Sequence, residues 1–287
     1  MKKEDIIINT LEEYELLDSG DGRKLERFST VITDRPDPQA IWSKKNQNIW
    51  INSQAQFVWA QQGERWKIEK NISETWNFSY KEISLELSCK GFKHVGVFPE
   101  HSFQWDEIMS LGKKYKDLKM LNLFGYTGAA SIAGAIAGMN VTHIDASKTT
   151  IATVKQNMKL SNLADDSIRT VCEDTLKYVK RLVQRGEKFE VIVMDPPAFG
   201  RGPKGEVWKI EESLSELLSL IPSLLGNDAK LIILNGYASG YASRTFAEAL
   251  EDALSENTGK IIYGDIGIKQ KDFYRILTTG IYAKWIA

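Results

Sequence analysis

The second half of the chain alternates short apolar runs with amphipathic stretches. Continuous apolar runs bounded by turn residues predict buried strands, and apolar positions that recur every three or four residues predict helices. The predicted strands cover residues 119–124, 140–145, 167–174, 189–195 and 230–235, and the predicted helices cover 127–138, 147–163, 176–186, 206–225 and 239–256. Because strands separated by helices form βαβ units, this pattern predicts a doubly wound α/β domain with a mostly parallel sheet.

The two ends of the chain follow other patterns. At the C-terminus, 260–268 and 274–286 are strand-like with no helix between them, which predicts an antiparallel hairpin that completes a seven-stranded, Rossmann-like sheet. Before about residue 110 the chain is rich in Trp, Phe and Tyr, and short alternating runs such as 49–59 predict strands. We therefore expect a small β-rich N-terminal domain over 1–92 and the α/β domain over 93–287. The alternative is that the N-terminal strands cap the α/β domain rather than fold alone.

Composition narrows the functional classes. The 37 Lys and Arg residues balance 38 Asp and Glu residues, so no global charge favours nucleic acid, a membrane or an acidic partner. The first residues carry acids on both sides of a short apolar stretch and do not resemble a secretory signal, and we expect no membrane span. Two cysteines, Cys89 and Cys172, suit a reducing cytoplasm. The three histidines and two cysteines are widely spaced, which predicts no metal site.

A glycine-containing loop follows the strand at 119–124. It reads Gly125-Tyr126-Thr127-Gly128, and glycines at a strand-to-helix turn let the backbone approach a ligand and supply positive φ. The spacing is not G-x-G-x-x-G, and no Gly-Lys-Ser/Thr follows, so a phosphate cradle is disfavoured. The alternative is an ordinary tight turn.

Acids follow the next two strands. Asp145 comes 20 residues after Gly125, where an acid can accept hydrogen bonds from ribose hydroxyls, and Glu173 and Asp174 can accept from an adenine amino group. The alternative for Asp145 and Asp174 is helix capping. Together these acids predict an adenosine pocket. A sulfonium cofactor is cationic and has no phosphates, so carboxylates without a pyrophosphate fingerprint favour S-adenosylmethionine, and methyl transfer, over a dinucleotide.

The stretch VIVMDPPAFGRG at 191–202 runs from a buried strand into an acid and two prolines. We expect Asp195 to lie beside the loop at 125–128, at the switch point of the sheet. Pro196 and Pro197 fix φ and lack N–H groups, which would leave carbonyls free to accept from a substrate amine, while Phe199 stacks on a flat ring. The alternative is a stiff turn that ends the strand, with a core phenylalanine.

These motifs resemble a known family. LNLFGYTGAAS, HIDAS and VIVMDPPAFGRGPKGEVWKIEESL resemble the class I S-adenosylmethionine-dependent methyltransferases, and more narrowly the family of bacterial 23S rRNA large-subunit methyltransferases that modify cytosine C5 or guanine N7. YELLDSGDGRKLERF and FKHVGVFPEHSFQWDEI are similar to an uncharacterised bacterial branch of that family. The resemblance implies that a segment closes over the cofactor, namely Phe98, Pro99 and Glu100, of which Phe98 and Glu100 would contact it. It implies that the other cofactor-binding residues are Phe124, Gly125, Tyr126, Thr127, Gly128, Asp145, Ala146, Glu173, Asp174 and Asp195. It also implies a catalytic turn formed by Asp195, Pro196, Pro197 and Phe199.

The sequence departs from that family at two points. Methylation at cytosine C5 requires a thiolate that adds to the ring. The family places this cysteine after the fourth or the fifth strand, where this chain has Ala198 and residues 235–237 (Asn-Gly-Tyr), so covalent chemistry is disfavoured. Cys172 falls on the adenine side, where a small buried hydrophobe is the favoured interpretation. Phe199 also stands four residues after the acid rather than three as in amino-methylating DPPY enzymes, which argues against exocyclic-amine methylation. Direct attack by a nitrogen or oxygen remains.

No general base is evident, and a direct displacement that depends on proximity does not require one. By residue type the candidates are His94, His101 and His143. His143 falls within a strand and is expected to be a core residue, whereas His101 borders the segment at 98–100.

The sequence does not decide whether the methyl acceptor is RNA or another substrate. Basic residues on the helix at 176–186 or beside the catalytic turn favour RNA, with Trp208 as a neighbouring aromatic: Lys177, Lys180, Arg181, Arg185, Lys188, Arg201, Lys204 and Lys209. A solvated helix face is the alternative for 177–188. Ribosomal RNA is the favoured acceptor, a small molecule or protein is the second, and a non-catalytic adenosine-ligand-binding protein or a dinucleotide enzyme is the third.

Overall fold

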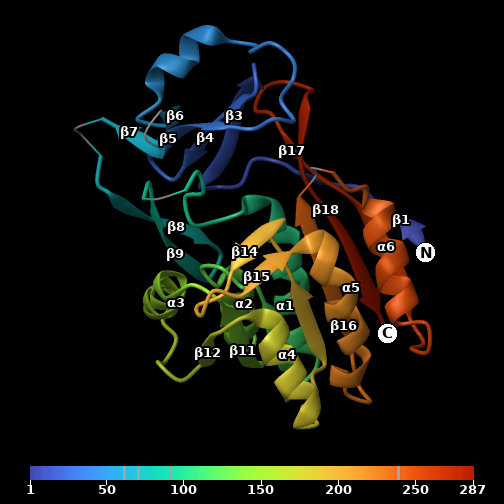
Figure 1. Ribbon diagram of the computed structural model, residues 1–287. Helices are drawn as coiled ribbons and strands as arrows, with labels where there is room; N and C mark the ends of the chain where they lie inside the picture. Colours follow the sequence, from blue (N-terminus) through green and yellow to red (C-terminus); the bar gives the residue numbers. More distant parts are fainter. Residues whose placement is uncertain (61–62, 70–71, 91, 238–239) are drawn as a thin grey trace. The chain divides into compact units, whose positions relative to one another are not determined.

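The computed structural model describes residues 1–60, 63–69, 72–90, 92–237 and 240–287 (Figure 1). Packing divides the chain into two units. Unit 1 comprises Met1–Ile6, Phe103–Ile266 and Gly280–Ala287, and unit 2 comprises Ile7–Ser102 and Gly267–Thr279. The expected boundary between residues 92 and 93 differs from this division, which also assigns a segment near the C-terminus to unit 2. The domain limits 1–92 and 93–287 therefore stay predictions.

The core of unit 1 is a central sheet that is parallel over most of its width. Its strands follow the order β1-β17-β18-β16-β13-β10-β11-β12, and β2 pairs with β17. Their bounds are β1 Lys2–Lys3, β2 Ile6–Ile8, β10 Lys119–Leu123, β11 Asn140–Asp145, β12 Ile168–Cys172, β13 Val191–Met194, β16 Leu231–Tyr237, β17 Lys260–Lys269 and β18 Ile276–Ile286. The described sheet has nine strands rather than the predicted seven, because β1 and β2 near the N-terminus add to β17.

The strand order reverses at β10, as the alternation of strands and helices predicts. β10 pairs in parallel with β11 on one side and with β13 on the other, with Leu123 opposite both Ile144 and Met194. β13 pairs in parallel with β16, whereas β18 runs antiparallel to β16. The carboxyl ends of β10, β11 and β13 therefore meet at a switch point, where doubly wound sheets bind their ligands.

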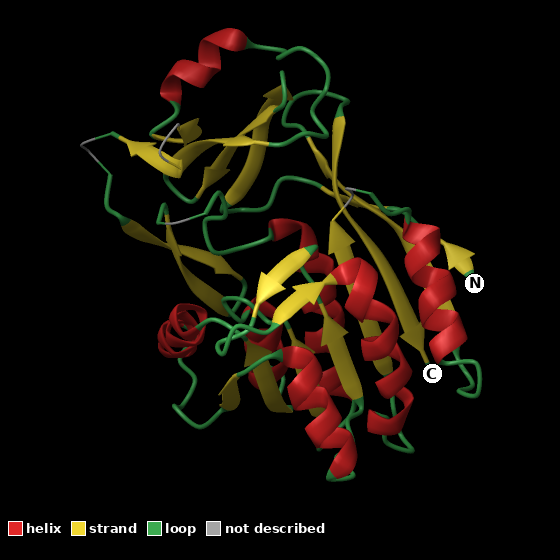
Figure 2. Cartoon of the chain, in the orientation of Figure 1, coloured by secondary structure: helices red, strands yellow, loops and turns green. Residues whose placement is uncertain are grey.

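Helices cover both faces of this sheet (Figures 1 and 2). Their bounds are α1 Ser102–Lys114, α2 Ala129–Ile136, α3 Lys148–Leu160, α4 Thr175–Gln184, α5 Ile210–Leu220 and α6 Ser243–Ala253, and the 3₁₀ helix η3 covers Pro222–Leu224. The Ser147 hydroxyl accepts from Thr150 N at 3.2 Å and is the N-cap of α3. The core on the α4–α6 side packs side chains such as Leu123, Met194, Tyr178 and Phe246 against one another.

One predicted element is wrong at its start. The helix expected from residue 206 begins at Ile210, because the preceding residues form a short antiparallel hairpin of β14 (Phe199–Arg201) and β15 (Val207–Lys209). The stretch Gly202-Pro203-Lys204-Gly205 turns between these strands, and Gly205 has φ +89°. We call this element the β14–β15 hairpin.

Within the described residues, unit 2 contains a five-stranded sheet and a two-stranded sheet, which agrees with the expected β-rich character. Their strands are β3 Tyr14–Gly20, β4 Arg23–Phe28, β5 Val31–Pro36, β6 Ala55–Ala60 and β7 Gly63–Ile68, and β8 Thr75–Tyr80 and β9 Ile83–Ser88, with 3₁₀ helices η1 Gln47–Asn52 and η2 Pro99–His101. The strand predicted over 49–59 is wrong in its first part, because residues 49–52 belong to a 3₁₀ helix and the strand begins at residue 55. The Asp18 carboxylate is fully buried and accepts from the backbone of Ser19, Lys45 and Asn46, from Trp50 Nε1 and from Gln270 Nε2.

Within the described part of the chain, no helix is long and apolar enough to cross a membrane.

Candidate methyl-transfer site

The loop after β10 and the turn after β13 lie side by side. Leu123 and Met194 are register partners, and Asp195 N donates to Leu123 O at 3.3 Å. Phe124 and Asp195 are therefore the first residues beyond a matched pair of parallel strands. This placement agrees with the sequence-based expectation that Asp195 follows its strand beside the loop at 125–128.

The backbone of this loop is strained, though not where the sequence suggested. Gly125 does not adopt positive φ, whereas its neighbours Phe124 and Tyr126 do, at +56° and +49°. Gly128, the N-cap of α2, has φ +94°. Left-handed conformations of non-glycine residues are uncommon and concentrate at ligand sites. The expectation that both glycines supply positive φ is correct only for Gly128.

Gly125 is required for a different reason, namely close approach. A Cβ atom built on it would lie 2.4 Å from Cε1 of His143 and 2.9 Å from Nδ2 of Asn122. The imidazole of His143 thus packs directly against the loop backbone, which leaves no room for a side chain at residue 125.

Hydrogen bonds from several elements fix the loop. Gly125 N donates to Ile144 O at 2.9 Å, and Tyr126 N donates to Asp145 Oδ2 at 3.0 Å. From α3, the buried Asn157 donates through Nδ2 to Thr127 O at 2.9 Å. Asn157 is a supporting residue that sequence reasoning missed, because a single polar residue within an amphipathic helix carries no distinguishing signal.

Asp145 is half-buried at the end of β11. Besides Tyr126 N it accepts from Ser147 N at 2.9 Å through Oδ1. Burial raises the pKa of this carboxyl, although the two backbone N–H donors act in the opposite direction. A carboxylate has about four lone-pair positions and these two contacts occupy one on each oxygen, so capacity for further donors remains.

A buried polar chain lies below the loop. Asn122 Nδ2 donates to Ser131 Oγ at 2.8 Å, and Ser131 Oγ lies 2.9 Å from Nδ1 of His143. Burial lowers the pKa of His143 to about 4, so the imidazole is neutral at physiological pH. The expectation that His143 is a packed core residue is confirmed.

The acids after β12 already have partners within the chain. Asp174 is the N-cap of α4 and accepts from Lys177 N at 2.9 Å, and Glu173 forms an ion pair with Arg181 that lowers the pKa of the glutamate. Helix capping, one of the two interpretations of Asp174, thus describes its contact here. Nearby, Cys172 is only partly buried, and its Sγ lies 3.6 Å from Ala146 O.

In the Asp195-Pro196-Pro197 turn, one of the two proline carbonyls already accepts a hydrogen bond from within the chain. Trp208 Nε1 of the β14–β15 hairpin donates to Pro197 O at 2.7 Å. The expectation that both proline carbonyls remain without competition is therefore wrong for Pro197. Trp208 lies beside the turn, as the sequence predicts, and its side chain is buried. Phe199 lies on the hairpin and is 55% exposed, so it is not a core residue.

Residues 235–237, which the sequence analysis places after the fifth central strand, are the last residues of β16. Asn235, at the carboxyl end of β16, forms a reciprocal pair with Gln104 of α1, with donor–acceptor distances of 2.6 and 3.0 Å. Both side chains are buried.

Several of the predicted basic residues have acidic partners. Lys180 pairs with Glu216 at 2.6 Å, Lys209 with Glu212 at 2.7 Å, and Lys177 with Glu206 at 3.8 Å. Arg201 instead lies over the Phe199 ring, 5.9 Å from its centroid. These contacts favour the solvated-face interpretation of α4 and leave the β14–β15 hairpin as the more suggestive surface.

The segment expected to close over the cofactor belongs to unit 2. Phe98 caps the 3₁₀ helix η2, and Pro99 and Glu100 within it are buried. The Phe98 ring lies 5.0 Å from that of His94 and 6.0 Å from that of His101. Burial lowers the pKa of His94 to about 2, and burial raises the pKa of Cys89, also in unit 2, to about 12.

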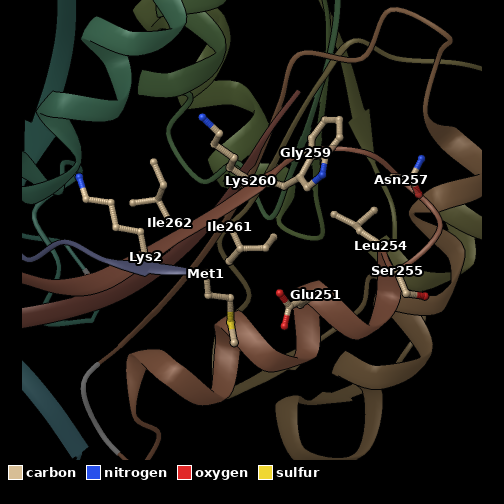
Figure 3. A pocket seen from close by; sticks show the side chains of 11 residues that line it. Met1, Lys2, Glu251, Leu254, Ser255, Asn257, Gly259, Lys260, Ile261 and Ile262 are labelled. Carbon is tan, nitrogen blue, oxygen red and sulfur yellow. The ribbon is translucent and has the colours of Figure 1, made fainter.

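Two hollows of unit 1 are lined by residues other than the predicted site residues. One, of about 620 Å³, lies between the start of β17, β1 and the end of α6 (Figure 3). The other, of about 300 Å³, lies between α5 and α6. Within the described residues, no group of three or more His, Cys, Asp or Glu side chains is placed to hold a metal ion.

A doubly wound sheet with a strained loop after its first strand, acids after the next two and a DPP turn at the switch point defines the class I methyltransferase fold. Comparison with a solved structure identifies the family. The SAM-dependent methyltransferase from Agrobacterium tumefaciens matches with a TM-score of 0.94 and 32% identity, over 99% of this chain and 95% of that one. The chain belongs to the S-adenosylmethionine-dependent methyltransferases, as its motifs predict.

Other comparisons are partial or more distant. A family model described as "Conserved hypothetical protein 95" matches residues 103–219. Ribosomal RNA large subunit methyltransferase K/L from Shewanella frigidimarina is 33% identical over 153 residues, which are 53% of this chain and 21% of that protein. The chain thus spans about a fifth of this curated relative. SMU.776, solved as a complex with SAH, shares the fold with a TM-score of 0.76 at 16% identity, over 96% of this chain and 75% of that one.

Proposed function

We propose that this protein transfers the methyl group of S-adenosylmethionine to a nitrogen or oxygen of an RNA, with ribosomal RNA as the favoured acceptor, in the cytoplasm. The observation that carries the proposal is the juxtaposition of the strained loop at Phe124–Gly128, which would hold the cofactor, with the Asp195-Pro196-Pro197 turn, which would hold the acceptor. Direct transfer, rather than transfer through a covalent adduct, is supported by Ala198 and Asn235 at the positions where a catalytic cysteine would stand.

The residues after β10, β11 and β12 fit this cofactor. The strained backbone at Phe124 and Tyr126 is typical of ligand loops, and the half-buried Asp145 has acceptor capacity for two ribose hydroxyls. Ala146, Glu173 and Asp174 would surround the adenine, with Asp174 remaining the cap of α4. Phe98, Pro99 and Glu100 would cover the cofactor.

The cofactor would supply a methyl group on a positively charged sulfur. An acceptor lone pair would attack the methyl carbon while the carbon–sulfur bond breaks toward sulfur, and the acceptor would release its proton to solvent. The Asp195 carboxylate and the Pro196 carbonyl would orient the acceptor, and the exposed Phe199 would stack on its ring. Such a displacement depends chiefly on alignment of the reacting atoms.

RNA as the acceptor is supported by the K/L relatives and by the β14–β15 hairpin. The hairpin presents Phe199 and Arg201 together at the surface, and aromatic and guanidinium planes are the groups on which unstacked bases pack.

A small-molecule or protein acceptor is the second candidate. The paired cations of α4 favour it, because a lysine already bound to glutamate contributes less to phosphate binding.

Three experiments test the proposal. Calorimetric titration should show micromolar affinity for S-adenosylmethionine and no binding of NAD. Transfer of a labelled methyl group to unmodified 23S rRNA, compared with protein and small-molecule extracts, then identifies the acceptor. Binding to bulk RNA should weaken steeply with salt concentration for an RNA enzyme, and a flat salt dependence would favour the second candidate.

A further inference from the structure

Trp208 connects three parts of the site. Its indole N–H donates to Pro197 O at 2.7 Å, and its ring lies 4.7 Å, centroid to centroid, from that of Phe124. Phe124 precedes Gly125 in the loop after β10, Pro197 belongs to the turn after β13, and Trp208 itself stands on β15. With only 4% of its surface exposed, the side chain is fixed between these segments.

The β14–β15 hairpin depends on this contact for its position. Ala198 alone separates Pro197 from β14. Directly after β15, Ile210 N donates to Ala198 O at 3.0 Å, which joins the two ends of the hairpin. Because side chains alternate along a strand, the inward Trp208 places its neighbour Val207 outward, 53% exposed. On the paired strand, Phe199 and Arg201 flank Gly200, the register partner of Trp208.

We infer that Trp208 is a positioning residue that sets the Asp195–Pro197 turn and the hairpin carrying Phe199 against the loop that would hold the cofactor. Prolines fix φ but not ψ, so Pro196 and Pro197 stiffen the turn without determining where the next residues go. The hydrogen bond to Pro197 O supplies that constraint. It also occupies one lone-pair position of this carbonyl, so a substrate donor at Pro197 O would share the oxygen with the indole. The inference rests on the proposed function.

The test variant is Trp208→Phe, which keeps an aromatic ring against Phe124 but deletes the N–H donor. The matched control is Trp285→Phe on β18, because Trp285 is also 4% exposed, belongs to the same unit and lines the hollow away from the predicted site. With labelled S-adenosylmethionine and unmodified 23S rRNA as probes, we expect Trp208→Phe to lower kcat about tenfold, since small displacements of reacting groups cost large factors in rate. The KM for S-adenosylmethionine should change less than twofold, and Trp285→Phe should leave both values near wild type.

Two outcomes of this assay would overturn the inference. One is a kcat within twofold of wild type. The other is a parallel loss of kcat, cofactor affinity and Tm, which would assign Trp208 a structural role only.

A second measurement does not depend on the acceptor. The eight tryptophans give separate indole N–H signals in ¹⁵N NMR spectra, and Trp208→Phe assigns one of them. We expect the Trp208 signal to exchange slowly with deuterium and to shift when S-adenosylhomocysteine is added, because Phe124 connects it to the predicted cofactor loop.

Exchange as fast as that of Trp59, which is 60% exposed, would overturn the inference. If the wild-type protein methylates no RNA, the proposed acceptor is wrong, and the exchange and titration results then decide the role of Trp208.

Discussion

Replacement of Asp145 by alanine should weaken cofactor binding strongly and destabilise unit 1 moderately. In the structure the carboxylate accepts from Tyr126 N at 3.0 Å and from Ser147 N at 2.9 Å, so alanine leaves two backbone donors without their acceptor. Hydrogen bonds to a charged group are worth about 1.5–3 kcal/mol each. Burial of the charge, which raises the pKa of Asp145, offsets part of this gain. We therefore expect a loss of about 1–3 kcal/mol in the free energy of unfolding.

The effect on cofactor affinity follows from the remaining acceptor positions. If ribose hydroxyls use them, loss of the carboxylate removes about 1.5–3 kcal/mol of binding free energy, which corresponds to a Kd about 10- to 150-fold higher. Asp145→Asn keeps one acceptor oxygen, so its Kd and its stability should fall between those of wild type and alanine. Calorimetry with S-adenosylhomocysteine measures the Kd, and urea denaturation measures the stability.

The matched control is Asp166→Ala, an exposed acid of the same unit in the loop before β12. It should leave both quantities near wild type. A Kd of Asp145→Ala within threefold of wild type would refute the role assigned to this carboxylate, whatever the change in stability.

Three further predictions follow. Asp195→Ala should leave the Kd for S-adenosylhomocysteine within about threefold of wild type but abolish methyl transfer, because Asp195 would be one of many cofactor contacts but the main group that orients the acceptor; full activity in the labelled-methyl assay would contradict this role. Gly125→Ala should cost about 1–3 kcal/mol of stability, because its Cβ would stand 2.4 Å from His143 Cε1, and a double-mutant cycle with His143→Ala in urea denaturation should show that the two losses are not additive. Asp18→Asn should destabilise unit 2 by about 3 kcal/mol, since the carboxylate is fully buried among five donors. Those donors hold the pKa of Asp18 in the folded protein below its usual value. The stability that the carboxylate contributes is therefore fully present above the ordinary aspartate pKa and is lost as the pH falls through the lowered pKa of the folded state. The difference in stability between wild type and Asp18→Asn should shrink in acid, and a difference independent of pH would argue against this account.

The sequence predicted the central strands and the placement of the site because those features have strong local signals. The apolar runs that became β10, β11 and β13 are each followed by glycine or by acids, and parallel strands bring their carboxyl ends to one edge. The Ser147 cap was also readable, since serine before an amphipathic stretch is a helix-start signal.

Other features depend on tertiary contacts that no local pattern records. β14 and β15 have three residues each, too few for a periodicity, so the hairpin was assigned to a loop and to the start of a helix. Trp208 stands in a glycine-rich stretch that carries no local signal of burial, and only the fold brings its indole to Pro197. The requirement for glycine at residue 125 is likewise non-local, because the imidazole of His143 on β11 occupies the space that a side chain would need.

The order in which the chain is synthesised matters for Asp18. Its acceptor oxygen Oδ1 binds Gln270 Nε2, a partner 252 residues later in the sequence. Gln270 lies in Gly267–Thr279, the part of unit 2 that follows almost all of unit 1. On the ribosome, residues 7–102 emerge before residue 270, so this buried carboxylate lacks one of its donors until that later segment has been made. Unit 2 therefore reaches its final stability only after residues 267–279 have been synthesised.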